Sequence, residues 1–152
     1  GTRSRTNSAY GAALGVFLKQ KILKKPFTIV GNGNQKRDFI YVSDVCKAFY
    51  KALIKDLPNN KFNIGFGKPR KVNEMVKIIG GSKTYLPKRP GEPDLTHADI
   101  NKAKKFLLWK PQITLEKGLN MVLKNINYWK DAPLWTPKKI KLATRDWFKY
   151  IK

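Results

Sequence analysis

The sequence has very few residues of three chemically informative kinds. Its 152 positions include one cysteine, one histidine and 10 acidic residues. A lone cysteine cannot form an internal disulfide, which indicates a reducing, cytoplasmic compartment. The His/Cys spacing of a zinc site is also missing. These scarcities argue against a disulfide-stabilised secreted protein and against a zinc-binding module.

Long apolar runs are missing as well. None of the runs reaches the ~18 residues that suggest a membrane span, and no stretch resembles a signal peptide. The sequence therefore predicts no membrane partner. The chain begins without methionine, in the polar stretch "GTRSRTNS". From this start we expect that the sequence is the later part of a longer protein whose first half is absent here.

Positive charge, in contrast, is abundant. The 32 lysines and arginines give a formal net charge of +22. Nucleic acid is the obvious partner for such a field. The excess is nearly all lysine, however, spread from Lys19 to Lys152, with no arginine-rich run and no RNA-binding aromatic signature. We therefore favour solvated surface lysines together with an anionic small ligand. A basic, non-enzymatic nucleic-acid-binding domain remains the alternative of another class.

The order of apolar patterns predicts an α/β fold. The length and the 41% hydrophobic content suffice for a domain with a real core. Helical spacing and stop signals predict helices over residues 9–24, 45–56, 71–79, 100–108 and 114–131. Runs of β-forming residues predict strands within 27–34, 39–42, 61–67 and 82–87.

The helix over residues 45–56 carries the most detailed predictions. Ser43 is a good N-cap residue, and Asp44 favours the first turn. Cys46 lies inside the apolar pattern, so we expect a core position for it. One face of this helix should pack on the core through Val45, Ala48, Phe49, Ala52 and Leu53.

Turn and cap residues separate these elements. Gly31 and Gly33 can adopt positive φ after the first strand. Gly80 suits the end of a helix. Asp99 is a candidate N-cap, and Thr114 lies at capping distance from Lys117, although lysine replaces the expected glutamate there.

Catalytic signatures are not found in this sequence. There is no G-x-G-x-x-G followed by a helix, no nucleophile elbow and no metal-spaced cluster. His97, the single histidine, stands alone before a helix, and we interpret it as structural.

Five segments nevertheless resemble one enzyme family when they are taken in order. They read "FTIVGNGNQKRDFIYVSDV", "FNIGFGKP", "LPKRPGEPD", "ADINKAKKFLLWKP" and "QITLEKGL". This order and spacing resembles the C-terminal half of extended short-chain dehydrogenase/reductases. These are NAD-dependent nucleotide-sugar epimerases, dehydratases and decarboxylases. The resemblance covers residues 1–127, which is most of the chain.

The resemblance implies a fold of two parts, of which the chain supplies one. A Rossmann domain would hold NAD, and the smaller α/β part would close over a UDP- or dTDP-hexose. In this family the dinucleotide loop and the Tyr-x-x-x-Lys pair lie in the N-terminal half, which we expect to be absent here. The parent enzyme would be a homodimer. The chain alone should then lack activity.

The resemblance also assigns binding residues. Arg37 matches the arginine of the family's "RDF/Y-x-x-V" motif, and Arg89 that of its "R-x-G-[DE]" loop; both would bind the diphosphate. Glu92 would accept hydrogen bonds from the ribose hydroxyls. Thr28 and Val30 lie on the strand edge where the base would bind. Arginine suits a diphosphate because its planar fork donates paired hydrogen bonds.

Each assignment has a structural alternative. Arg37 could pair at the surface with Asp38 or Asp44, a contact worth little. Arg89 could be a solvated loop charge, and so could Glu92. Asp38 is better interpreted as structural, accepting hydrogen bonds from amides of the turn between the preceding glycine-rich loop and the strand.

We therefore predict two regions. Residues 1–130 would be the nucleotide-sugar-binding region, and residues 131–152 an aromatic, basic tail docked on it. We favour a parent enzyme resembling UDP-glucose 4-epimerase, with a 4,6-dehydratase or decarboxylase as the alternative within the family. No catalytic, cofactor-binding or metal-binding residue is assigned to this chain.

Overall fold

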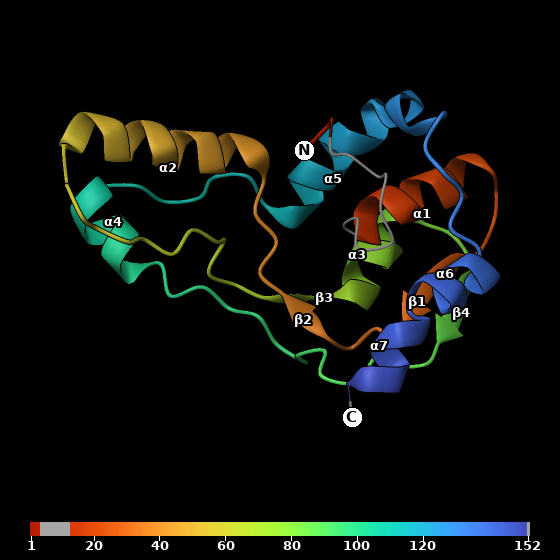
Figure 1. Ribbon diagram of the computed structural model, residues 1–152. Helices are drawn as coiled ribbons and strands as arrows, with labels where there is room; N and C mark the ends of the chain where they lie inside the picture. The colour runs from red at the N-terminus through yellow and green to blue at the C-terminus, as the bar shows by residue number, and fades with distance from the viewer. Residues whose placement is uncertain (4–12, 152) are drawn as a thin grey trace.

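The computed structural model describes residues 1–3 and 13–151. Within this described part, helices and strands are interspersed as far as β4 (Lys83–Leu86), and only helices follow β4 (Figure 1). They are α1 (Ala13–Ile22), β1 (Phe27–Val30), β2 (Lys36–Arg37), α2 (Val42–Lys55), β3 (Arg70–Lys71), α3 (Val72–Ile79), β4 (Lys83–Leu86), α4 (Asn101–Leu107), α5 (Leu115–Lys124), a 3-10 turn η1 (Ile126–Trp129), α6 (Pro137–Ala143) and α7 (Arg145–Tyr150). The predicted α/β class is confirmed.

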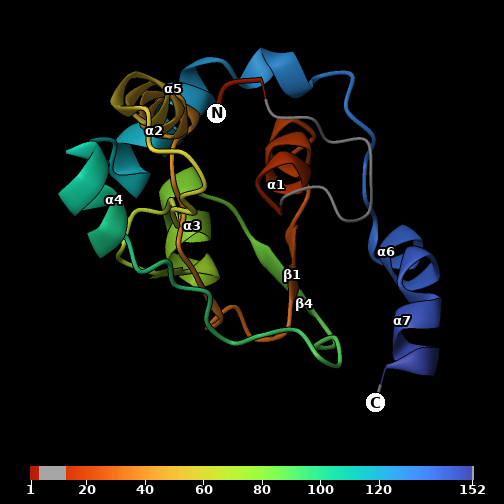
Figure 2. The same cartoon turned by 60° about the vertical axis from the view of Figure 1, so that its left-hand side comes forward.

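The four strands among these described residues form two short two-stranded sheets. β1 and β4 pair in parallel, from Phe27 opposite Lys83 to Val30 opposite Leu86, and Figure 2 shows them side by side. β2 and β3 pair in antiparallel fashion. The strands predicted within 27–34 and 82–87 are thereby confirmed, because both contain a paired four-residue segment.

The main core lies between β1 and three helices. It joins residues of α1, β1, α3 and α5: Phe17, Phe27, Ile29, Val72, Met75, Val76, Ile79 and Leu119. The rings of Phe17 and Phe27 meet with their centroids 5.5 Å apart. α3 buries four of its eight residues, as its apolar spacing requires.

A second core lies at the far end of the molecule, where α2 and α4 run close together in Figure 1. Its buried residues are Ala48, Ile100, Ala103, Leu107 and Trp109. Small side chains from both helices meet here, which allows the two backbones to approach closely.

The predicted packing of α2 is wrong for several residues. Cys46 is exposed rather than buried. Phe49 and Leu53 are 74% and 78% exposed. α2 contacts the body of the protein through Asp44 and Ala48, its only buried residues, and Ala52 packs on the second core. The predicted apolar face is therefore covered at Ala48 and Ala52 and open to solvent at Phe49 and Leu53.

Residues 39–42 do not form the predicted strand. Only Lys36–Arg37 pairs, and residues 38–41 have no partner strand within the part of the chain that the structure describes. α2 begins at Val42, with extended Tyr41 as its N-cap, so Ser43 is not the cap. Asp44 does lie in the first turn. Residues 61–67 also form no strand, so the strand predicted there is wrong as well.

The predicted turn and cap residues Gly31, Gly33, Gly80 and Thr114 are confirmed. Gly31 and Gly33 have φ of 69° and 75°, and a Cβ on Gly33 would collide with the Asn73 side chain. Gly80 ends α3 with φ of 75°. Thr114 Oγ1 accepts a hydrogen bond from the Lys117 amide at 3.3 Å.

The remaining helix predictions hold with shifted ends. α1 occupies part of the predicted range 9–24, whose residues 9–12 lie outside the described residues. Asp99 accepts a hydrogen bond from the Asn101 amide at 2.9 Å, although Ile100 holds the N-cap position of α4. In the described part of the chain, no helix is both long and apolar enough to cross a membrane.

Candidate functional site

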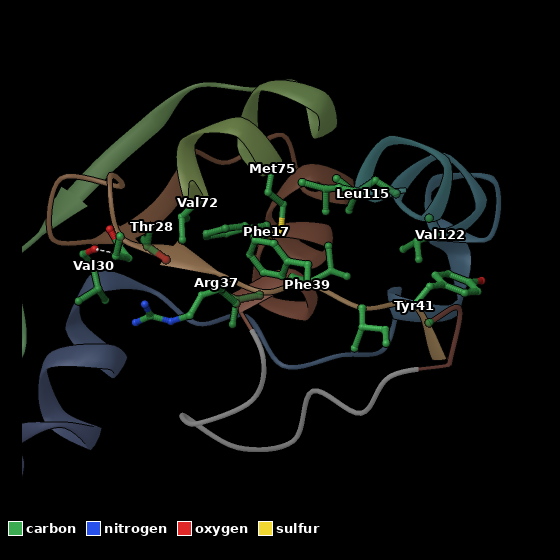
Figure 3. A pocket seen from close by; sticks show the side chains of 18 of the residues that line it. Phe17, Thr28, Val30, Arg37, Phe39, Tyr41, Val72, Met75, Leu115 and Val122 are labelled. Carbon is green, nitrogen blue, oxygen red and sulfur yellow. Dashed lines mark hydrogen bonds between the residues drawn. The ribbon is translucent and has the colours of Figure 1, made fainter. Parts of the chain in front are cut away.

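A pocket of about 610 Å³ opens beside the main core. Its walls come from α1, β1, the segment 35–41, α3, the loop after β4, α5 and the C-terminal segment. Figure 3 shows that its two ends differ: Thr28, Val30 and Arg37 lie at one end, and Tyr41, Leu115 and Val122 at the other. Phe17, Phe39 and Met75 lie between them. The pocket therefore has a polar end and a long apolar floor.

All five residues predicted to bind substrate line this one pocket. They are Thr28, Val30, Arg37, Arg89 and Glu92. They come from three separate segments: β1, β2 and the loop that follows β4. The fold thus brings together residues up to 64 positions apart in the sequence.

Backbone hydrogen bonds fix how the loop meets β2. The Lys36 amide donates to the Asp94 carbonyl at 2.7 Å, and the Thr96 amide donates to the Lys36 carbonyl at 3.1 Å. Residues 94–96 therefore run along β2 as a further pairing segment. Because Arg37 follows Lys36 directly, this pairing places Glu92 beside Arg37.

Arg37, Arg89 and Glu92 form a compact charged cluster. Arg37 Nη2 donates to Glu92 Oε1 at 3.1 Å, and Arg89 Nη1 lies 4.0 Å from Glu92 Oε2. The three side chains are only 18–23% exposed. Two guanidinium groups share one carboxylate, so the cluster keeps a net positive charge with donors available for an anion.

The geometry excludes the two ion-pair partners that were considered for Arg37 from the sequence. Its partner is Glu92, 55 residues away in sequence, rather than Asp38 or Asp44. Arg89 likewise lies in the pocket wall and is not a freely solvated charge. A loop glutamate holding both arginines could not be read from the sequence, because the pairing depends on how residues 94–96 align with β2.

Asp38 has the structural role that the sequence suggested, with different partners. Its carboxylate accepts hydrogen bonds from the amides of Phe66, Gly67 and Ala98 at 3.0–3.1 Å. The predicted partners were amides of the loop before it. Asp38 therefore anchors residues 66–67 and 98 to the end of β2, directly next to Arg37.

The single histidine takes no part in the pocket. His97 Nε2 lies 3.2 Å from the Gly67 carbonyl, which is a structural contact. Among residues 1–3 and 13–151, no group of three or more His, Cys, Asp or Glu side chains could hold a metal ion.

Arg70 joins the two helices that form the apolar wall. It pairs with Glu74 of α3 and, through Nη2 at 2.8 Å, with Glu116 of α5. These hydrogen bonds raise the pKa of Arg70. The pKa of Glu74 is lowered, first by the Lys71 amide and then by Arg70, and the pKa of Glu116 is lowered by its own amide and then by Arg70.

Sequence reasoning missed most of the residues that line the pocket, including two from the C-terminal segment, and one residue that supports it. Trp135 and Ile140 line the pocket from the C-terminal segment, and Gln20 of α1 supports it while being only 2% exposed. The density of aromatic residues near the C-terminus was a signal for docking, but it did not indicate where the segment docks. Gln20 gave no signal, because a glutamine within a helical pattern is usually solvated.

Comparison with known proteins identifies the family. The GDP-mannose 4,6 dehydratase family matches residues 14–122. A putative UDP-glucose 4-epimerase of Methanocaldococcus jannaschii is 39% identical over 116 residues, which cover 72% of this chain and 37% of that protein. UDP-glucuronic acid decarboxylase 1 of Arabidopsis thaliana is 36% identical over 114 residues, which cover 72% of this chain and 26% of that protein.

Solved structures agree with the sequence relatives. A mutant UDP-glucuronic acid 4-epimerase of Bacillus cereus was crystallised with UDP-4-deoxy-4-fluoro-glucuronic acid and NAD. It superposes with a TM-score of 0.70 at 31% identity, over 79% of this chain and 40% of that chain. The chain spans about a third of the length of the curated relatives it matches.

These matches agree with the resemblance seen in the five sequence segments, and they extend to the fold. The neighbouring structures include epimerases, and the sequence relatives include epimerases and decarboxylases. The chain belongs to the GDP-mannose 4,6 dehydratase family, and its α/β fold matches the C-terminal part of extended short-chain dehydrogenase/reductase epimerases.

Proposed function

We propose that this chain binds a UDP- or dTDP-sugar and forms the substrate-binding part of an NAD-dependent nucleotide-sugar epimerase resembling UDP-glucose 4-epimerase. The observation that carries the proposal is the convergence of Arg37, Arg89, Glu92, Thr28 and Val30 on one pocket. These residues supply the chemistry that a nucleoside diphosphate requires.

The diphosphate is assigned to the arginine cluster. A nucleotide sugar carries about two negative charges there, and guanidinium groups bind such oxygens through paired, charge-assisted hydrogen bonds. Only 6 of the 32 basic residues are arginines, and two of these six line this pocket. Glu92 holds both side chains in place while leaving N–H groups free to donate.

The nucleoside and the sugar are assigned to the remaining walls. Glu92 Oε2 is buried and accepts no hydrogen bond within the described residues, so it can accept one from a ribose hydroxyl. Thr28 and Val30 provide a strand edge for the base. In this arrangement, Arg37 and Arg89 orient the phosphates between the nucleoside end and the sugar.

The residues present do not fit NAD. Gly31 and Gly33 follow a strand, as glycines of a dinucleotide loop do, but no helix follows them at once. Gly33 has no side chain, and the Asn73 side chain of α3 occupies that space. The Asn73 backbone amide donates to the Gly33 carbonyl at 2.9 Å. The turn is therefore packed against protein and does not form a phosphate cradle.

We accordingly assign to the chain alone the binding of a nucleotide sugar, but not its conversion. Its sequence contains no Tyr-x-x-x-Lys pair and no dinucleotide loop. NAD, in this proposal, binds to polypeptide outside these 152 residues, within a homodimeric parent enzyme. Incubating the purified chain with UDP-glucose and NAD should yield no epimerised, dehydrated or decarboxylated sugar.

A second candidate reaction follows from the relatives. The Arabidopsis decarboxylase is 36% identical to this chain, close to the 39% of the methanogen epimerase. A decarboxylase or a 4,6-dehydratase would use the same diphosphate cluster. The two alternatives differ in the sugar they convert and share the nucleotide-binding chemistry assigned here.

The test is a calorimetric titration of UDP into the wild-type chain and its single variants. Arg37→Ala and Arg89→Ala should each weaken binding by about 1.5–3 kcal/mol, the worth of a hydrogen bond to a charged group. Arg37→Lys and Arg89→Lys should recover only part of this loss, because a point charge does not reproduce the planar fork.

Lys104→Ala and Lys141→Ala are the matched controls for loss of positive charge. Both lysines are exposed and neither lines the pocket, so UDP affinity should stay unchanged. Equal losses at the lysines and at the arginines would show that only net charge attracts the nucleotide, and would refute the diphosphate site.

A further inference from the structure

The C-terminal segment, residues 131–151, supplies part of the pocket although it lies outside the family match. That match ends at residue 122, whereas Trp135 and Ile140 line the pocket together with Thr28, Arg37 and Arg89. Figure 2 shows the segment running from η1 down to α6 and α7, on the side of the molecule opposite α4. This wall is therefore a feature that the family comparison does not account for.

A buried glutamine fixes Trp135 next to the strand edge. Gln20 Nε2 donates to Thr28 Oγ1 at 2.8 Å and to the Trp135 carbonyl at 3.0 Å. The Thr28 amide donates in turn to Gln20 Oε1 at 3.1 Å. Thr28 and Trp135 thus share one side chain that is 2% exposed, so their relative position is set by three hydrogen bonds.

The indole N–H of Trp135 is buried without an acceptor among the described residues. Such a group loses its hydrogen bonds to water and gains none from the protein, a cost of about 1–3 kcal/mol. An indole nitrogen donates and never accepts, so only an acceptor atom can satisfy it. Trp135 also lines the pocket, so its side chain lies in a wall that a bound ligand would contact.

Trp147 contacts Arg89 and the backbone next to it. Its Nε1 donates to the Pro90 carbonyl at 2.7 Å, and the guanidinium carbon of Arg89 lies 5.8 Å from the centroid of its ring. A cation at this distance from an indole ring is attracted to it. Trp147 therefore holds both the backbone after Arg89 and the Arg89 side chain.

We propose that residues 131–151 form the nucleoside-recognition wall of the site. Trp135 donates its indole N–H to a carbonyl oxygen of a pyrimidine base bound along Thr28, and Trp147 positions Arg89 for the diphosphate. The inference rests on the proposed function, because it takes the ligand to be a nucleoside diphosphate. It adds a base-contacting residue and a positioning residue from a segment beyond the family match.

Trp135→Phe tests the direct contact, since it keeps an aromatic ring and removes the N–H. UDP affinity should fall about fivefold, the worth of one neutral hydrogen bond. Inorganic pyrophosphate, which has no base, should bind the variant and the wild type equally. The change in tryptophan fluorescence on adding UDP should be reduced in this variant.

Trp129→Phe is the matched control. Its indole N–H is also buried without an acceptor among the described residues, and the side chain is 1% exposed, but it does not line the pocket. The variant is expected to melt at a lower temperature and to keep the UDP affinity of the wild type. Circular dichroism melts of both variants separate loss of folding from loss of binding.

Trp147→Phe tests the positioning role through a double-mutant cycle with Arg89→Ala. The single change should weaken UDP binding about threefold in the wild-type background, since it removes the anchor on Pro90. In the Arg89→Ala background it should have no effect on UDP affinity, because there is no arginine left to position. An equal effect in both backgrounds would mean that Trp147 is only structural, and would overturn its assigned role.

The outcomes separate this inference from the proposed function. UDP binding that depends on Arg37 and Arg89 but is unchanged by Trp135→Phe would overturn the nucleoside wall and leave the diphosphate site intact. Wild-type protein that is folded and binds neither UDP nor pyrophosphate would overturn the proposed function itself. An equal loss of UDP and pyrophosphate in folded Trp135→Phe would also overturn the assignment to the base.

Discussion

The helices α3 and α2 show how differently the two ends of this molecule are built. α3 has eight residues, four of them buried against β1, α1 and α5. α2 has 14 residues, and only Asp44 and Ala48 are buried. Both helices are amphipathic in sequence, yet only α3 has its apolar face fully covered.

The difference matters for where a ligand can bind. The end that contains α3 has a continuous core, and the pocket is formed on that rigid base. The end that contains α2 exposes large apolar side chains, including Phe49, Tyr50, Leu53 and Ile54. Exposed apolar surface of this kind favours association rather than selective binding of a charged small molecule. The candidate site therefore belongs to the α3 end.

The same substitution on each helix gives the sharpest contrast in stability. Ile79 on α3 is 3% exposed and Ile54 on α2 is 53% exposed. Ile79→Ala should lower the free energy of unfolding by about 2–5 kcal/mol, because it leaves a cavity in the core. Ile54→Ala should change it by less than about 0.5 kcal/mol. Urea denaturation of both variants measures these free energies of unfolding. Similar losses at Ile79 and Ile54 would contradict the difference in packing between α3 and α2.

The joint between the two ends gives the next largest effect. Asp44, in the first turn of α2, accepts hydrogen bonds from the amides of Gln112 and Ile113, each at 2.8 Å. Asp44→Ala should cost about 2–3 kcal/mol, because it removes a fully buried carboxylate that accepts from two part-buried amides. Asp99→Ala is the control at an exposed carboxylate that accepts one amide, and it should cost about 1 kcal/mol or less. Thermal melts that rank the two variants in the reverse order would contradict this role.

The smallest effect concerns pH. Hydrogen bonds from backbone amides and from Arg70 lower the pKa of Glu74 and Glu116 below the ordinary value of 4.5. The folded state therefore binds these protons less tightly than the unfolded state does. Their stabilisation is present above about pH 4.5 and is lost as the pH falls through the lowered pKa values.

Glu116→Gln provides the comparison for this pH effect. It removes one carboxylate from the pair that joins α3 to α5, so its melting temperature should fall less steeply below pH 4.5 than that of the wild type. The effect should be modest, because these side chains are partly solvated. Parallel curves for the two proteins between pH 3 and pH 6 would show that the Arg70 contacts contribute no measurable stability.

Local signals were sufficient for much of the α3 end. β1 and β4 follow from β-forming runs bounded by turn residues, and Gly80 and Thr114 act as the cap residues that their chemistry predicts. These features depend on neighbours within a few positions, so a sequence pattern contains them. The family motifs also placed the five candidate binding residues, and the fold brings all five to one pocket.

Nonlocal packing explains what the sequence could not predict. The aromatic and β-branched residues 39–41 suggested a strand, but among residues 1–3 and 13–151 no partner strand lies beside them. Their side chains line the pocket instead. Cys46 and Phe49 fit an apolar helical pattern, yet both are exposed, because α2 packs on the second core through Ala48 and Ala52. The contact of Glu92 with Arg37 likewise depends on how a distant segment pairs with β2.

The most direct test of the nucleotide-sugar assignment is a paired titration of UDP and of duplex DNA into the wild-type chain at two salt concentrations. The pocket predicts that UDP binds, and that its affinity depends on Arg37 and Arg89 while surface lysines such as Lys104 have no effect. A nucleic-acid-binding domain would instead bind DNA with an affinity that falls steeply with salt and with each lysine removed. Tight, strongly salt-dependent DNA binding, with UDP indifferent to both arginines, would contradict the assignment.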